Sequence, residues 1–285
     1  MFNNLAFMSV SVLARLTSGV FLFVLLARAW GAEVFGSFML PYVITSLAVI
    51  LIDYGFGLQL VRAISLMRND APRRVARALG AKLILTGLVF AGSVLILNLF
   101  RTSFEFQGLY WALMLATTLN SFAVFFSLPL RALDRFKVES QTAVVGNLAL
   151  IVVVCGLVFF GVGAFGVALG FMVARLLYAG LAYAALKKTL GPLPWRSMRL
   201  DETLSVLVSG FPFGVHLALG TLYFQVDTLI IQKLLGSYEV GIYQAGMRLL
   251  LGGLILTEVL NNVFLPLMAQ LSNQPRELAD ITSKL

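Results

Sequence analysis

The chain has 285 residues, of which 60% are hydrophobic and 12% charged, and its formal net charge is +8. Soluble proteins contain about 45–50% apolar residues, so this composition excludes a soluble domain and predicts an all-α polytopic membrane protein. A single Cys and a single His exclude a disulfide framework and a Cys/His metal cluster, and we predict neither a metal nor a cofactor. The basic residues lie in short loops between apolar runs, a pattern typical of membrane topology rather than of nucleic-acid binding.

Apolar runs long enough to cross a bilayer occur eight times, since a helical span needs about 20 apolar residues. The first run is too long for the core of a signal peptide, so we interpret it as an uncleaved first span. Long apolar runs joined by short connections favour a bundle of antiparallel helices over a β-barrel. The predicted spans are about 5–27, 37–58, 79–99, 108–130, 141–160, 164–186, 204–231 and 240–268.

Basic residues are distributed unequally between the two sets of loops. The loops after the second, fourth and sixth spans hold 13 Lys and Arg residues, whereas the opposite loops hold Arg28, Arg101 and Lys233. Because cytoplasmic loops carry the excess of Lys and Arg, this bias places the basic loops and both chain ends in the cytoplasm. The 13 residues are Arg62, Arg68, Arg73, Arg74, Arg77, Lys82, Arg131, Arg135, Lys137, Lys187, Lys188, Arg196 and Arg199.

The longest basic loop, residues 59–78, has the pattern of an amphipathic segment on the membrane surface. Its residues Arg73, Arg74 and Arg77 are placed to contact anionic lipid headgroups. A simple topology signal is the alternative interpretation of the same residues.

Two segments resemble each other at an offset of 205 residues, as between Gly31 and Gly236 or Gly36 and Gly241. The first is LLARAWGAEVFGSF, residues 25–38, and the second is IIQKLLGSYEVGIY, residues 230–243. Six of their 14 positions are identical or closely alike, so chance similarity is the alternative. A true repeat would mean that the chain is built from two related units.

Three arginines lie inside predicted spans, where a charge costs at least about 2.5–3.5 kcal/mol at the bilayer centre. Arg15 and Arg175 have no acid at a matching depth on an adjacent span. Guanidinium groups suit phosphate oxygens, so we interpret Arg15, Arg175 and Arg248 as lining a cavity that receives an anion.

Three acids also lie inside predicted spans, namely Asp53, Asp227 and Glu258. Asp227 lies at a depth similar to that of Arg248 on the next helix, so these two are candidates for an ion pair that registers the seventh span on the eighth. Glu258 lies about 15 Å deeper in the membrane than Arg248. We assign the three acids to ion coupling or to helix pairing.

Sequence features of an enzyme are missing. The chain has no Gly-x-x-x-x-Gly-Lys phosphate loop, no Ser/His/Asp set and no metal-ligand spacing. The acids within spans are too far apart in depth for paired glycosidase carboxylates. We therefore predict no catalytic residues and no enzymatic activity.

Four segments together resemble the polysaccharide flippase family of the multidrug/oligosaccharidyl-lipid/polysaccharide exporter superfamily. They occur in the expected order and extend over the chain. The segments are LARAWGAEVFGSF at 26–38, DYGFGLQLVR at 53–62, RALDRF at 131–136 and VDTLIIQKLLGSYEVGIYQAGMRL at 226–249.

The resemblance implies a bacterial inner-membrane transporter made of two six-helix lobes around a central V-shaped cavity. It implies that an oligosaccharide on an undecaprenyl-type pyrophosphate moves from the cytoplasmic to the outer leaflet during surface polysaccharide or O-antigen synthesis. Arg15, Arg175 and Arg248 are the residues that would make the cavity cationic. Asp53, Asp227 and Glu258 would be candidates for a proton or sodium site. The bilayer and, further, polysaccharide assembly proteins would be its partners.

The length of the repeat sets an expectation for domain organisation. If 205 residues form one six-span lobe, two lobes need about 410 residues. On this reasoning 1–190 is a complete lobe, 191–203 a cytoplasmic linker, and 204–285 the first hairpin of a second lobe with a short tail. A chain of 285 residues would then be truncated, with transport by the chain alone in doubt.

Three alternatives to the flippase remain open. A drug/cation antiporter of the same superfamily would require acids in the first lobe, where the mid-depth charges are basic. A membrane polysaccharide polymerase or glycosyltransferase would require larger outer loops or a cytoplasmic catalytic domain. The last alternative is an inactive truncated product or a non-transporting assembly subunit.

Overall fold

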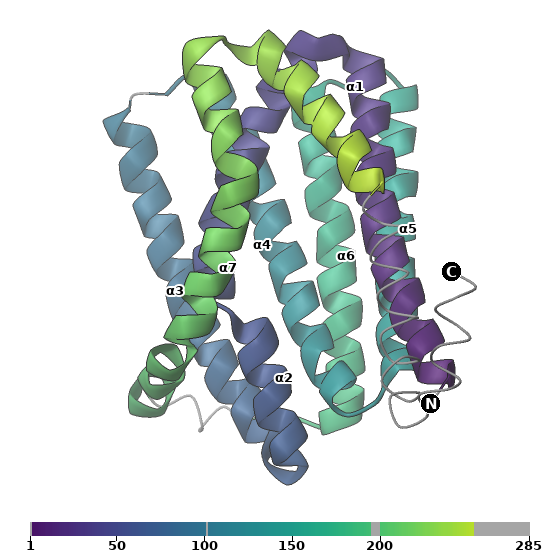
Figure 1. Ribbon diagram of the computed structural model, residues 1–285, viewed down its shortest axis with the longest axis vertical. Helices are drawn as coiled ribbons and strands as arrows, with labels where there is room; N and C mark the ends of the chain where they lie inside the picture. The colour runs from purple at the N-terminus through teal and green to yellow at the C-terminus, as the bar shows by residue number, and fades with distance from the viewer. Residues whose placement is uncertain (1, 101, 195–199, 254–285) are drawn as a thin grey trace, which may run out of the picture.

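The computed structural model of the chain describes residues 2–100, 102–194 and 200–253, and this part is all-helical. Figure 1 shows the helices packed side by side in one bundle. The helices are α1 (Phe2–Asp53), α2 (Phe56–Leu66), α3 (Ala71–Leu99), α4 (Phe104–Ala132), α5 (Phe136–Phe159), α6 (Ala164–Leu190) and α7 (Leu200–Leu234), with a short 3₁₀ turn η1 (Arg68–Asp70) before α3. A further helix includes residues 237–253.

Helix α1 is two membrane spans folded at Gly31. As a straight helix its 52 residues would measure about 78 Å, far more than the roughly 30 Å of a bilayer core. Gly31 has φ 72° and ψ 174°, a backbone conformation that favours glycine. The Phe23 and Tyr42 rings, which lie before and after this bend, are therefore only 4.9 Å apart. This hairpin corresponds to the first two predicted spans.

The described residues contain six helical stretches that are long and apolar enough to cross a membrane. The first of these includes the α1 hairpin and counts as two spans, which gives seven, and 237–253 continues as a helix to the edge of the described part. An α-helix pairs all its backbone groups within the segment, as a bilayer requires. The prediction of an all-α polytopic membrane protein is confirmed, and the described residues hold seven spans where about eight were predicted for the whole chain.

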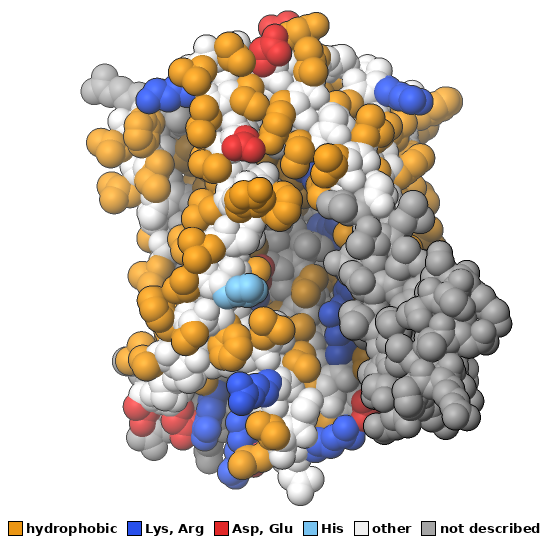
Figure 2. All heavy atoms as spheres, viewed as in Figure 1, with side chains coloured by type: hydrophobic (Ala, Val, Ile, Leu, Met, Phe, Trp, Pro, Cys, Tyr) orange, Lys and Arg blue, Asp and Glu red, His pale blue; other side chains and the backbone are white. Residues whose placement is uncertain are grey.

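The bundle has one basic end. Figure 1 places the amino terminus of α1, helix α2 and the starts of α3, α5 and α7 at its lower end, and Figure 2 shows Lys and Arg side chains gathered there. The opposite end carries the bend at Gly31 and the connections before α4, before α6 and after α7. We call the lower end the basic end.

Three apolar clusters hold the helices together, and two of them are large. The cluster nearer the basic end is built around Phe56, Phe125 and Tyr178, and the cluster nearer the opposite end around Phe38 and Phe171. Many large apolar side chains point outward, as expected for helices that face lipid rather than water. Examples are Leu95, Leu99, Val152 and Phe159, which are 69–85% exposed.

The structure corrects the limits of two predicted spans. Helix α3 begins at Ala71 rather than near residue 79, and Lys82, which sequence analysis counted with the loops, is fully buried within it. Helix α5 begins at Phe136 rather than near residue 141, so Glu139 is a buried helical residue. Span limits read from hydropathy are pulled inward by charged residues, even where partners make burial of the charge possible.

The loop 59–78 is mostly helical. Phe56, Leu60 and Ile64 are buried at intervals of four residues along α2, and this spacing gives the helix one apolar face. Arg62 and Leu66 lie on its exposed side. The amphipathic pattern is confirmed, whereas its contact with lipid headgroups stays a prediction.

Candidate functional site

The two copies of the repeated segment touch each other at the end opposite the basic end. A Cβ atom added to Gly36 would overlap the carbonyl oxygen of Ser237, and one added to Gly241 would overlap the carbonyl oxygen of Ala32. Ala32 and Ser237, like Gly36 and Gly241, are separated by 205 residues. The contact is thus reciprocal, as in a two-fold interface. Chance similarity offers no reason for such a contact, so the geometry supports a true repeat.

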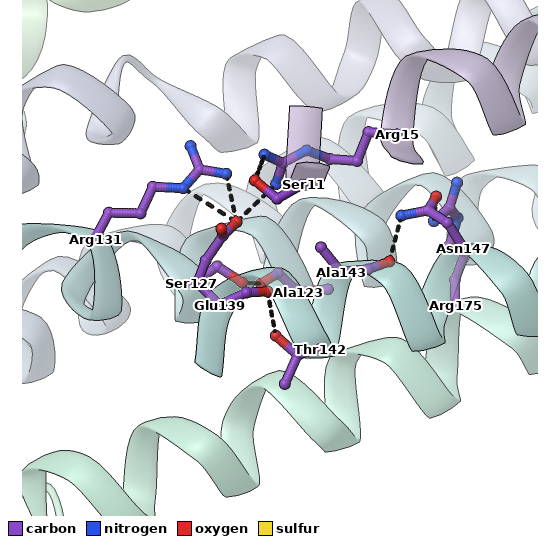
Figure 3. Close-up of polar contacts among 10 residues, drawn as sticks. All are labelled: Ser11, Arg15, Ala123, Ser127, Arg131, Glu139, Thr142, Ala143, Asn147 and Arg175. Carbon is purple, nitrogen blue, oxygen red and sulfur yellow. Dashed lines mark hydrogen bonds and ion pairs between the residues drawn. The ribbon is translucent and has the colours of Figure 1, made fainter. Parts of the chain in front are cut away.

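A carboxylate shared by two arginines lies between α1, α4 and α5. Arg15 Nη1 is 3.1 Å from Glu139 Oε1, and Arg131 donates to the same oxygen from Nη2 at 2.7 Å and from Nε at 3.1 Å. Arg15 Nη2 also donates to Ser11 at 3.2 Å. Figure 3 shows both arginines converging on Glu139. The Glu139 side chain is fully buried, and its Oε2 has no hydrogen-bond partner among the described residues.

The expectation that Arg15 has no acid at its depth is therefore wrong. Sequence analysis placed Glu139 in a cytoplasmic loop, because its charge shortened the predicted fifth span. In the structure α5 extends to Phe136 and carries Glu139 beside Arg15 of α1. The binding role that we assigned to Arg15 stays a prediction.

Arg175, on α6, belongs to a second polar group that is centred on Asn147. Asn147 lies on α5, two turns after Glu139. Arg175 Nη1 donates to Asn147 Oδ1 at 3.2 Å, and Ser18 Oγ donates to the same oxygen at 3.1 Å. Asn147 Nδ2 is anchored on the carbonyl oxygen of Ala143 at 2.7 Å. Figure 3 shows Asn147 and Arg175 beside the Glu139 group. Arg175 forms no ion pair within the part of the chain that the structure describes.

Arg248 packs against aromatic rings of the α1 hairpin. Its guanidinium carbon lies 4.2 Å from the centre of the Phe23 ring and 5.8 Å from that of Tyr42, which is within cation–π range. Its Nε has no hydrogen-bond partner among the described residues. Tyr42 also lines a small pocket together with Arg175. Arg175 and Arg248 therefore both lie near Tyr42.

The ion pair considered for Asp227 and Arg248 does not form in the described structure. Asp227 Oδ2 accepts a hydrogen bond from the Tyr243 hydroxyl at 2.9 Å instead. Similar depth on neighbouring helices was not sufficient, because the Arg248 side chain turns toward Phe23. The contact still joins the two helices of this hairpin. Glu258 lies outside the described residues.

Asp53 joins α1 to α3 and α4. Its Oδ1 lies 2.7 Å from Lys82 Nζ and accepts a hydrogen bond from Ser121 Oγ at 2.5 Å. Lys82 Nζ lies 5.1 Å from the centre of the Phe122 ring. These contacts are those of helix pairing, one of the two roles that we considered for Asp53.

Positive charge exceeds negative charge in this region. Four arginines surround Glu139, Asn147 and Tyr42, namely Arg15, Arg131, Arg175 and Arg248. Among the described residues, Glu139 is the only carboxylate that pairs with any of these arginines. Figure 2 shows Lys and Arg side chains within a hollow on one face of the molecule. Excess positive charge at membrane depth is costly, and an anion would reduce that cost. Guanidinium forks match phosphate oxygens in particular.

Three participants were missed by sequence reasoning. Arg131 and Glu139 were assigned to loops, and Asn147 was not singled out because an amide resembles many inert polar residues within spans. One usable signal was present: Glu139, Ala143 and Asn147 follow at intervals of four residues, which places them on one face of a helix.

A family model described as polysaccharide biosynthesis protein matches residues 2–272. The matched range includes every helix described above. A search of curated proteins and a search of solved structures each found no match. Among the described residues there is also no group of three or more His, Cys, Asp or Glu side chains that could hold a metal ion.

Proposed function

Because the chain belongs to the polysaccharide biosynthesis protein family, we propose that it moves a lipid-linked oligosaccharide across the bacterial inner membrane. The lipid would be a polyprenyl pyrophosphate of the undecaprenyl type. The observation that supports this substrate most strongly is the surplus of arginines around Glu139, Asn147 and Tyr42. A pyrophosphate is the part of such a substrate that the membrane excludes and that guanidinium groups bind.

Each arginine has a distinct part in this proposal. Arg175 has an amide as its hydrogen-bond partner and Arg248 has aromatic rings, so both keep donors for phosphate oxygens. Arg15 and Arg131 share Glu139, and an arriving phosphate would compete with that carboxylate. Such competition gives binding that is strong enough to desolvate the pyrophosphate and weak enough to release it.

Transport also requires that the cavity open to each side in turn. We infer from the positive-inside rule that the basic end faces the cytoplasm. The contact between Gly36 and Ser237 and its counterpart between Gly241 and Ala32 would then close the outer side. Packed interfaces of this kind switch between discrete arrangements rather than deforming gradually, so separating the two repeats would open the outer exit.

The contacts of Asp53 and Glu139 favour this function over a drug/cation antiporter. Asp53 is paired with Lys82, and Glu139 with Arg15 and Arg131. An antiporter requires carboxylates that are free to exchange a proton or sodium ion for a cationic drug. Transport without catalysis also agrees with the surplus of binding groups in the cavity.

A complementation experiment in the native host tests the proposal. Replacing Arg175 by Ala should abolish surface polysaccharide and cause the lipid-linked oligosaccharide to accumulate, while the protein still inserts into the membrane. Lys188→Ala is the matched control, because Lys188 is an exposed basic residue of the same helix. Normal surface polysaccharide in a strain whose only copy carries Arg175→Ala would refute the proposal.

A further inference from the structure

A second basic site lies at the basic end and is formed by other arginines than those described above. It is a pocket of about 410 Å³ between α2, α3 and α7. Helix α2 supplies Arg62, α3 supplies Arg74 and Arg77, and α7 supplies Ser205 and Ser209. It shares no residue with the groups around Glu139, Asn147 and Tyr42.

The arginines of this pocket are only partly neutralised. Arg77 Nε lies 2.7 Å from Glu202 Oε2. Among the described residues, the one hydrogen bond of Arg74 runs from Nη2 to the Met67 sulfur, at 2.9 Å, and a thioether is a weak acceptor. Arg62 has no hydrogen bond or ion pair within the described part of the chain. Among the described residues, the one carboxylate that pairs with any of these three guanidinium groups is therefore that of Glu202.

The pocket has a fixed wall on the α7 side. Gln59 Nε2 donates to the Val206 carbonyl oxygen and to Ser209 Oγ, both at 2.9 Å. The hydroxyls of Ser205 and Ser209 donate to backbone oxygens of their own helix. The donors still available to a ligand are thus those of the arginines, which indicates an anionic ligand.

We infer that this pocket binds the phosphate group of an anionic lipid headgroup. Guanidinium forks bind phosphate oxygens in a bidentate manner, and Lys and Arg at the end of a membrane span attract anionic lipids. Leu66, which also lines the pocket, is 74% exposed, so an acyl or prenyl chain could continue along its apolar side chain. Arg74 and Arg62 are the principal ligands, and Arg77 is held beside them by Glu202.

The site has a structural consequence. A phosphate held by α2 and α3 against the wall formed by α7 would join the first six spans to the seventh. Because a ligand that binds only the folded state stabilises it, the headgroup should raise the thermal stability of the whole chain. This inference is independent of the proposed transport function, since binding here involves none of the cavity arginines.

Thermal unfolding of the purified full chain in a neutral detergent tests the inference. The probes are phosphatidylglycerol, undecaprenyl pyrophosphate, inorganic pyrophosphate and, as the zwitterionic reference, phosphatidylcholine. We expect Tm to rise with phosphatidylglycerol or undecaprenyl pyrophosphate and to be unchanged by phosphatidylcholine. The lipid that raises Tm at the lower concentration is identified as the source of the bound phosphate group.

Matched variants separate this pocket from general surface charge. Arg62→Gln together with Arg74→Gln should weaken the lipid effect about tenfold, as expected for the loss of a charge-assisted hydrogen bond. Arg135→Gln together with Lys137→Gln removes the same charge from exposed residues outside the pocket and should leave the effect intact. The single variant Arg62→Gln, at an exposed position, serves if the double variant does not fold.

Three outcomes would overturn the inference. The first is equal weakening by the two double variants, which would mean diffuse attraction to the surface. The second is no rise in Tm with either anionic lipid. The third is a rise with inorganic pyrophosphate alone, which would mean a site for a soluble anion rather than for a lipid.

Discussion

Gly36 and Gly241 make the same contact in opposite directions. Each lies against the backbone of the other repeat, Gly36 at Ser237 and Gly241 at Ala32, and all four positions are related by the 205-residue offset. A side chain at either glycine would separate the two segments. The repeated segments therefore pack directly on each other at the end opposite the basic end.

Gly36→Ala should lower the stability of the chain. The added methyl group would collide with the Ser237 backbone, and overpacking of this kind costs about 1–3 kcal/mol. Gly19→Ala is the control, since Gly19 lies in the same helix with no atom within 4 Å of an added Cβ. Thermal unfolding in detergent measures both variants. Equal Tm values for the two would contradict the close contact.

Glu139→Gln should destabilise the chain and strengthen anion binding. The change leaves Arg15 and Arg131 without their carboxylate, and removing one partner of a buried ion pair costs about 3–5 kcal/mol. The two arginines would then be free for another anion, so inorganic pyrophosphate should raise the Tm of the variant more than that of the wild type. Glu105→Gln, at an exposed position near the start of α4, is the control. A variant as stable as the wild type would show that the shared ion pair is unimportant.

Lys82→Met separates the two roles considered for Asp53. Loss of the cation should cost about 1–3 kcal/mol, less than for a fully buried pair because the Asp53 side chain is 41% exposed. Adding Asp53→Asn should restore most of the lost stability if the pair only joins helices, as a double-mutant cycle would reveal. If the double variant is stable but inactive in transport, Asp53 has an ion-coupling role as well.

Arg248→Lys should impair transport although the charge is kept. The Arg248 guanidinium carbon lies 4.2 Å from the centre of the Phe23 ring, and an ammonium lacks the planar fork of a guanidinium. Phe23→Leu should have a similar but smaller effect, because it removes the ring and leaves the arginine. Polysaccharide export per molecule of inserted protein is the quantity to compare. Full export with Lys at this position would mean that charge alone is sufficient.

Architecture was largely predictable from the sequence, because a bilayer imposes length and composition on each span. The α1 hairpin agrees with the first two predicted spans, 5–27 and 37–58, which leave Gly31 in the connection between them. The 205-residue offset related the two repeated segments, but their contact through Gly36 and Ser237 was found only in the structure. Charges at the span limits were harder to place. Glu139 and Lys82 are buried although hydropathy assigned them to loops, since their partners make burial possible.

Side-chain pairing was predictable only in part. Arg175 indeed has no ion pair among the described residues, whereas Arg15 pairs with Glu139, 124 residues away. Such a contact depends on which helices are neighbours, and the order of spans along the chain does not determine that. Asp227 and Arg248 show the converse, because their similar depth did not make them partners once aromatic rings and the Tyr243 hydroxyl offered other contacts.

The central claim is that the surplus arginines bind the pyrophosphate of a lipid-linked oligosaccharide during its passage across the membrane. The most direct measurement is the rate at which the purified chain in proteoliposomes moves a fluorescent polyprenyl-pyrophosphate oligosaccharide between leaflets. We predict movement by the wild type and by Lys188→Gln, and loss of at least about tenfold in rate for Arg175→Gln, as expected when a charge-assisted contact is removed. Equal rates for Arg175→Gln and the wild type would contradict the claim.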